Sequence, residues 1–208
     1  MHYTALRSGE AFSETYGAAG KVVVDIGGRD VNGSLRNFFE AQQMRFICVD
    51  MEAYPSVDLV VKPGEKLPFA DATVDLIVST SCFEHDPCFW LTFKEMARIL
   101  KPDGYIYINA PTGGHYHCYP GDNWRFYSDA GQALAYWSGI QMGGEEVHPV
   151  RVVETFNVLG DEWNDFVCVW TRTDVKQTEI TVQQDVLQLV GPLEVAIHSK
   201  GLGTRKKC

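Results

Sequence analysis

Seven short stretches rich in Val, Ile and aromatic residues recur along the chain and predict seven β-strands. The first three are nearly continuous apolar runs, which is typical of strands buried on both faces of a parallel sheet. The predicted strands lie at 21–26, 45–50, 57–61, 74–79, 105–110, 147–157 and 165–173. The pattern therefore predicts a sheet that is covered by helices on both faces.

Helical patterns fall between these strands. Ser34 can cap a helix containing Leu35, Phe38 and Phe39, and Ser128 can cap another that Gly139 stops. A third pattern of 3.6-residue spacing stops at 101–104 and contains Phe89, Phe93, Met96 and Leu100. Alternating strands and helices predict an α/β fold, a Rossmann-like open sheet with right-handed crossovers.

The end of the sheet differs from its beginning. Residues 160–164 separate the last two predicted strands, and this polar connection is too short for a crossover helix. We therefore predict an antiparallel hairpin, with the rest of the sheet mostly parallel and the last strand antiparallel. From position 174 the chain turns polar, so we expect one domain over 1–173 and an appendage or tail over 174–208.

Composition narrows the class of protein. The 208 residues are 45 % hydrophobic and 22 % charged, as in ordinary globular domains. The 18 basic and 27 acidic residues give a net charge of -9, which argues against a nucleic-acid partner. We find no membrane span or signal peptide and expect a cytoplasmic protein. The six cysteines lack CxxC spacing, so most are interpreted as small core residues in a reducing compartment.

The turn after the first predicted strand carries candidate chemistry, because ligands of open α/β sheets bind at the carboxyl ends of strands. Gly27 and Gly28 permit a close backbone approach, but Arg29 breaks the glycine spacing of a dinucleotide site. Asp25 would repel a pyrophosphate and attract an ammonium or sulfonium group. Asp50 ends the second strand and can accept both hydroxyls of a ribose. Each acid alone could be a cap or turn residue, but together they favour a nucleoside ligand.

Four segments in series carry a family resemblance. They are V-V-V-D-I-G-G at 22–28, F-I-C-V-D at 46–50, E-K-L-P-F-A-D-A-T-V-D-L-I-V-S at 65–79, and F-E-H followed by E-M-A-R-I-L-K-P-D-G-Y at 95–105. With them, residues 20–172 resemble the class I S-adenosylmethionine-dependent methyltransferases of type 11. The resemblance implies a seven-stranded sheet, the cofactor S-adenosylmethionine and the product S-adenosylhomocysteine.

The resemblance also implies roles for individual positions. Asp25 and the backbone of Gly27 and Gly28 would hold the methionine part, and Asp50 the ribose. The other implied cofactor positions are Met51 beside the adenine, Glu65 and Lys66 along its edge, and Ser79 and Thr80 beneath the cofactor. Arg29 can pair with the cofactor carboxylate or be a solvated surface residue. The chain departs from many family members at Arg29 and Val31, where they have glycines, and at Pro63, where they have an acid.

The segment from 111 to 127 is richer in chemistry than a connector requires. It leaves the carboxyl end of a central strand, so we expect it to overhang the methyl group, with residues 115–127 as the acceptor lid. His117 is the candidate general base, His115 and His85 are further candidates, and packing roles are the alternative. The residues predicted to shape the acceptor pocket are Tyr119, Trp124 and Arg125. His115, His117 and Cys118 supply too few donors for a structural zinc site, so no metal is predicted.

The favoured function is methyl transfer to a small molecule, lipid precursor or glycan. A fold can host several functions, so two alternatives stay open. One is another transfer at the same nucleoside site, such as aminopropyl transfer. The other is a non-catalytic module that binds S-adenosylmethionine.

Overall fold

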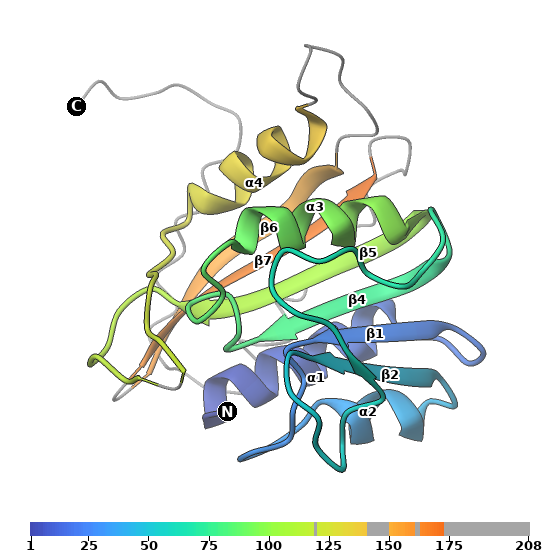
Figure 1. Cartoon of the computed structure of the whole chain (residues 1–208), viewed down its shortest axis with the longest axis horizontal. Helices are drawn as coiled ribbons and strands as arrows, with labels where there is room; N and C mark the ends of the chain where they lie inside the picture. Colours follow the sequence, from blue (N-terminus) through green and yellow to red (C-terminus); the bar gives the residue numbers. More distant parts are fainter. Residues whose placement is uncertain (119, 141–149, 161–162, 173–208) are drawn as a thin grey trace.

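The computed structural model describes residues 1–118, 120–140, 150–160 and 163–172, which form a seven-stranded sheet with helices on both faces (Figure 1). The helices are α1 (Tyr3–Tyr16), α2 (Arg36–Ala41), α3 (Phe89–Ile99) and α4 (Ala130–Gly139). The strands are β1 (Val22–Ile26), β2 (Arg45–Asp50), β3 (Leu59–Val60), β4 (Val74–Thr80), β5 (Leu100–Pro111), β6 (Val150–Leu159) and β7 (Asn164–Arg172). All seven predicted strands are present.

The strand order confirms the predicted fold class. The order is β3-β2-β1-β4-β5-β7-β6, and the neighbours from β3 to β5 pair in parallel. β7 runs antiparallel to both β5 and β6, so the predicted hairpin is present. The order reverses between β1 and β4, and their carboxyl ends lie beside that of β2. This is the point where open α/β sheets bind ligands.

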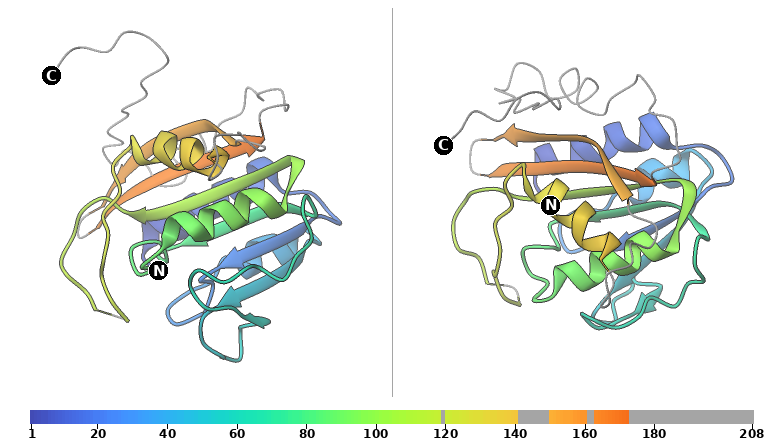
Figure 2. Two further views of the ribbon diagram at one scale, coloured as in Figure 1. Left: turned by 45° about the horizontal axis from the view of Figure 1, so that its top comes forward. Right: turned by 90° about the horizontal axis from the view of Figure 1, so that it is seen from above.

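Helices lie against both faces of the sheet (Figure 2), and a cluster of buried apolar side chains fills the space on each face. On one face, Phe12 of α1 packs against Phe39 of α2 and Tyr107 of β5. On the other face, Phe93 of α3 contacts Trp170 of β7 at 5.0 Å between ring centroids. The Trp170 indole N–H donates to the Gly131 carbonyl of α4 at 2.9 Å. Both faces are therefore closed, and the edge formed by the strand ends is left for a ligand.

Several local predictions need correction. Helix α1 was not predicted, because its buried face contains small and polar residues such as Thr4, Ser8 and Ser13 and gives little apolar periodicity. Ser128 does not cap α4: Asp129 precedes the helix, and no side chain caps it. The predicted helix stop before 101–104 agrees with the end of α3 at Ile99, but the fifth strand begins at Leu100 and not at 105, so 101–104 belong to β5. A register shift between Val74 and Leu76 in β4 accommodates this extra length of β5.

The cysteines divide by position. Cys48 and Cys168 are buried, Cys82 and Cys88 are partly buried, and Cys118 is exposed.

The predicted tail over 174–208 lies outside the described residues. Among the described helices, none is both long and apolar enough to cross a bilayer.

Candidate functional site

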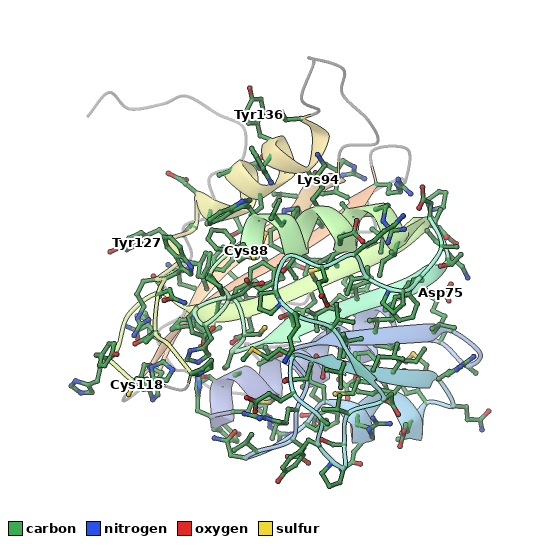
Figure 3. The ribbon with its side chains drawn as sticks, viewed as in Figure 1. Asp75, Cys88, Lys94, Cys118, Tyr127 and Tyr136 are labelled. Atoms are coloured by element: carbon green, nitrogen blue, oxygen red, sulfur yellow. The ribbon has the colours of Figure 1, made fainter. Side chains whose placement is uncertain are left out.

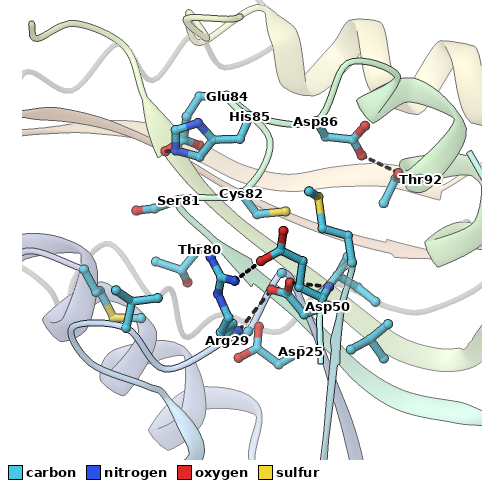
Figure 4. A pocket seen from close by; sticks show the side chains of 18 of the residues that line it. Asp25, Arg29, Asp50, Thr80, Ser81, Cys82, Glu84, His85, Asp86 and Thr92 are labelled. Carbon is cyan, nitrogen blue, oxygen red and sulfur yellow. Dashed lines mark hydrogen bonds and ion pairs between the residues drawn. The ribbon is translucent and has the colours of Figure 1, made fainter. Parts of the chain in front are cut away.

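A cavity of about 650 Å³ lies at the carboxyl edge of the sheet, where the strand order reverses. We call it the strand-end cavity. Its walls come from the turn after β1, the end of β2, the turn after β4 and the segment after β5 (Figure 4). Its volume lies within the range of roughly 300 to 1,000 Å³ that is usual for small-molecule and cofactor sites.

The turn after β1 is shaped by two glycines. Gly27 has φ +74°, and a Cβ at this position would lie 2.2 Å from Sγ of Cys82. A Cβ on Gly28 would lie 2.4 Å from Oδ2 of Asp25. The Gly27 N–H donates to the Val49 carbonyl at 2.8 Å, which ties the turn to β2. Glycine therefore lets the backbone pass close to Asp25 and the turn after β4.

Asp25 lines the cavity from β1 with only 3 % of its surface exposed. Burial raises the pKa of its carboxyl to about 7, the nearby Arg36 lowers it, and Asp50 raises it further. Desolvation disfavours the charged form of a carboxyl, whereas a cation next to it restores that form. The site therefore favours a ligand with a positive charge at Asp25.

Asp50 lines the cavity from the end of β2 and is held by two backbone donors. Its Oδ2 accepts the N–H of Arg29 at 3.3 Å, and its Oδ1 accepts the N–H of Glu52 at 3.2 Å. The Arg29 guanidinium pairs with the Glu52 carboxylate and lies 5.9 Å from the ring centroid of Tyr54. Figure 4 shows Arg29 and Asp50 side by side at this wall. Asp50 is thus oriented, and its remaining lone pairs can accept ligand hydroxyls.

The other predicted cofactor residues differ in position. Met51, Glu65 and Thr80 line the cavity together with Gly27, Gly28 and Arg29. Lys66 is exposed and is not a lining residue. Ser79 is fully buried, and its hydroxyl donates to the Ile26 carbonyl at 2.9 Å, which links β4 to β1 beneath the cavity.

The turn after β4 places Glu84 and His85 at the cavity wall. Glu84 is 1 % exposed, and burial raises its pKa to about 8. Within the described residues, its Oε2 has no hydrogen-bond partner. Burial also lowers the pKa of His85. The sequence pattern drew attention only to the histidine of F-E-H, and the buried acid before it was missed, although it lies in the turn that follows the central strand β4.

His117 reaches the same wall from the segment after β5. Its ring lies 4.9 Å from the His85 ring and 4.8 Å from the Trp163 ring, measured between centroids. Its Nδ1 lies 3.3 Å from Oδ2 of Asp122, and its backbone N–H donates to the same oxygen at 2.9 Å. Among the three candidate histidines, His85 and His117 are therefore brought together at the cavity.

The other predicted residues of that segment that the structure describes, His115, Trp124 and Arg125, do not line the cavity. His115 is exposed, and its carbonyl accepts from the Arg125 guanidinium at 3.0 Å. Arg125 also pairs with both carboxylate oxygens of Asp122. The Trp124 indole N–H donates to the Asp86 carbonyl at 2.9 Å. The Trp124 indole thus holds the segment onto the turn after β4, whereas Arg125 links residues within the segment itself. Tyr119 lies outside the described residues.

The outer side of this segment faces away from the cavity. Cys118 and Tyr127 lie at the surface in Figure 3, and Tyr127 is 72 % exposed.

The first two residues, Met1 and His2, also line the cavity, although the sequence pattern did not predict them there. His2 is anchored by Asp165 of β7, with 2.8 Å between Nε2 and Oδ2.

Comparisons with known proteins agree with this geometry. Residues 22–108 match the family described as methyltransferase domain. An uncharacterized methyltransferase of Mycobacterium sp. (strain KMS) is 32 % identical over 110 residues, which cover 46 % of this chain and 43 % of the relative. One from Mycobacterium leprae is 29 % identical over 130 residues, covering 54 % and 48 %. The chain thus matches about half the length of these relatives.

Solved structures share the fold. The 1,6-didemethyltoxoflavin-N1-methyltransferase of Burkholderia thailandensis has a TM-score of 0.63 at 18 % identity, covering 82 % of this chain and 79 % of that one. A SAM-dependent methyltransferase from Aquifex aeolicus has a TM-score of 0.56 at 16 % identity, covering 79 % and 90 %. Residues 22–108 therefore match the methyltransferase-domain family, and the described fold is shared with solved S-adenosylmethionine-dependent methyltransferases.

Proposed function

We propose that the protein binds S-adenosylmethionine in the strand-end cavity and transfers its methyl group to a small molecule, lipid precursor or glycan. One observation carries the proposal: two carboxylates, Asp25 and Asp50, stand beside a close-approach glycine turn in the same cavity. A nucleoside with a cationic amino-acid part needs both groups. A dinucleotide would instead bring a pyrophosphate toward the buried acid.

We call the part of the cavity around Asp25 and Asp50 the donor half. In the proposed binding mode, each part of S-adenosylmethionine lies beside a different residue of this half. Asp50 is oriented to accept the ribose hydroxyls, and Asp25 favours the ammonium of the methionine part. Met51 and Glu65 line the wall beyond Asp50, where the adenine would follow. Arg29 is already paired with Glu52, so a cofactor carboxylate would share its guanidinium.

The acceptor half lies toward Glu84, His85, His117 and Trp163. Methyl transfer is an in-line displacement at the sulfonium carbon, so the enzyme must mainly hold the nucleophile close to it and aligned. The cavity is a concave site of small-molecule size, and the net charge of -9 disfavours a polyanionic acceptor. The Burkholderia thailandensis neighbour, whose structure contains 1,6-didemethyltoxoflavin, supports a small-molecule acceptor.

Calorimetric titration tests the donor site. S-adenosylmethionine and S-adenosylhomocysteine should each bind once per chain. Asp50→Ala should weaken S-adenosylmethionine by about 1 to 3 kcal/mol, the usual cost of a charged hydrogen bond, and weaken an analogue without the ribose hydroxyls much less. Equal losses for both ligands would reject the ribose role, and a lack of binding to the unaltered protein would reject the proposal.

Turnover then separates the alternatives. Incubation with S-adenosylmethionine and a panel of hydroxylated and amino metabolites should release S-adenosylhomocysteine. Tight nucleoside binding without product from any acceptor would favour a binding module. Turnover of decarboxylated S-adenosylmethionine alone would favour aminopropyl transfer at the same site.

A further inference from the structure

Three side chains with metal-ligand atoms meet on the acceptor side of the strand-end cavity. Glu84 and His85 come from the turn after β4, and His117 comes from the segment after β5. Their ligand atoms all lie within 4.8 Å of one another. Oε1 of Glu84 and Nε2 of His85 are 3.6 Å apart, too far for a hydrogen bond. Donor atoms around one tetrahedral zinc lie roughly 3.3 Å apart, as its bond lengths near 2.1 Å require.

A buried oxygen in this cluster lacks a partner. Oε2 of Glu84 has no hydrogen-bond partner within the described part of the chain, although the side chain is only 2 % exposed. A buried carboxylate oxygen without a partner carries a desolvation penalty. A cation between Glu84 and the two imidazoles would offset this penalty.

Both histidines are oriented as metal ligands. Nδ1 of His85 contacts the Gly121 carbonyl, which can only accept, so this nitrogen carries the proton. Nδ1 of His117 faces two acceptors, Oδ2 of Asp122 at 3.3 Å and the His115 carbonyl at 3.4 Å. In each neutral ring, Nε2 therefore holds the lone pair. Metal-binding histidines are usually supported in this way through their second nitrogen.

The support itself is anchored. Asp122 is held by two contacts to the Arg125 guanidinium, and its side chain is 1 % exposed. The N–H groups of Asn123 and Trp124 both donate to the Glu84 carbonyl, at 2.7 and 3.2 Å. These contacts fasten the segment that carries His117 to the turn that carries Glu84 and His85.

We propose that Glu84, His85 and His117 form a binding site for a divalent transition metal, zinc by its donor set, on the acceptor side of the cavity. Two imidazoles and one carboxylate suit zinc better than magnesium or calcium, and three protein ligands leave a coordination position open. Ion binding would require the His117 ring, which is 38 % exposed, to move its ligand atom closer to the other two, since the three lie within 4.8 Å of one another.

The metal site indicates which class of acceptor is methylated. This role rests on the proposed methyl transfer. A metal ion held there would bind an alcohol or phenol oxygen at its open position and would lower the pKa of that hydroxyl. The proton passes to solvent water. The oxygen lone pair then forms the O–CH₃ bond while the S–CH₃ bond breaks, and that electron pair returns to sulfur. The products are a methyl ether and S-adenosylhomocysteine, so no further reactant is needed.

Zinc calorimetry and cobalt spectroscopy on the tag-free full chain test the site. We expect one ion per chain, bound at least about 10-fold more weakly by Glu84→Gln and by His117→Ala. His115→Ala is the matched control, because this exposed histidine lies outside the cluster, and it should keep the full affinity. Circular dichroism checks that each variant is folded.

Three results would overturn the site. They are zinc affinity that is unchanged in both cluster variants, a thiolate-to-cobalt charge-transfer band that places the ion on a cysteine, and a lack of saturable zinc binding to the unaltered protein. Titration of zinc-free protein with S-adenosylmethionine separates this proposal from the proposed function. Nucleoside binding without zinc binding rejects the metal site alone, whereas zinc binding without nucleoside binding rejects the methyl-donor assignment alone.

Discussion

Asp25 is an acidic residue at a buried position, where the ionised form of its carboxyl is disfavoured. It lies within β1, between Cys48 of β2 and Val78 of β4 in the register of the sheet, and burial raises its pKa to about 7. A ligand ammonium next to it would favour the ionised form. Binding of S-adenosylmethionine should therefore strengthen as the pH rises toward about 7 and level off above it.

The same carboxyl should also set a pH dependence of stability. The folded-state pKa of about 7 lies above the unfolded value near 3.9, so its stabilising effect is complete below about pH 4 and is lost as the pH rises through 7. The loss is at most about 4 kcal/mol for a shift of this size. Urea unfolding should show that the free energy of unfolding decreases less between pH 5 and pH 8 in Asp25→Asn than in the unaltered protein. An equal decrease in both proteins would contradict the raised pKa of the Asp25 carboxyl.

The turn between β1 and α2 is an element whose shape depends on glycine. Gly27→Ala would combine a strained positive φ with a Cβ that lies 2.2 Å from Cys82. Gly20 is the matched control, because it has φ +82° but no atom within 4 Å of its added Cβ. We expect Gly27→Ala to destabilise the fold by about 1 to 3 kcal/mol more than Gly20→Ala, the usual cost of overpacking. Equal free energies of unfolding for the two variants would show that the turn accommodates a Cβ at position 27 without cost.

Elements were predictable where apolar runs alternate with turns. The strands and the β6–β7 hairpin follow from such runs and from the short connection between them. Helix α1 gave no such signal, because residues as small as Ser8 and Gly9 lie in its buried face. The beginning of β5 was missed since Pro102 and Gly104 resemble a turn, yet they lie in a strand with a register shift.

Of the cavity lining, the side formed by Asp25 and Asp50 was predictable, and the side formed by Glu84 and His117 was predictable only in part. Asp25 and Asp50 stand at strand ends, so the sheet order alone brings them together. The acceptor half depends on how one segment folds back onto another. Trp124 anchors that segment to the turn after β4, and the buried Glu84 lines the cavity instead. Contacts of this kind, between residues about 40 positions apart, leave no local pattern in a sequence.

At the scale of the whole molecule, α1 is part of the core and not an appendage. Phe12 is fully buried and contacts Tyr16, Phe39 and Tyr107. Phe12→Ala should reduce the free energy of unfolding by about 3 to 5 kcal/mol, whereas Tyr3→Ala, at a residue 57 % exposed, should stay within about 0.5 kcal/mol. Denaturant unfolding measures both. A small effect of Phe12→Ala would mean that the sheet is stable without this helix.

The central claim is that the strand-end cavity holds the methyl donor, and a crystal structure with S-adenosylhomocysteine tests it most directly. The account predicts the ribose hydroxyls within about 2.6 to 3.2 Å of the Asp50 carboxylate, with the ammonium toward Asp25 and the sulfur toward Glu84 and His117. A nucleoside bound elsewhere, or bound here with its ribose away from Asp50, would contradict it.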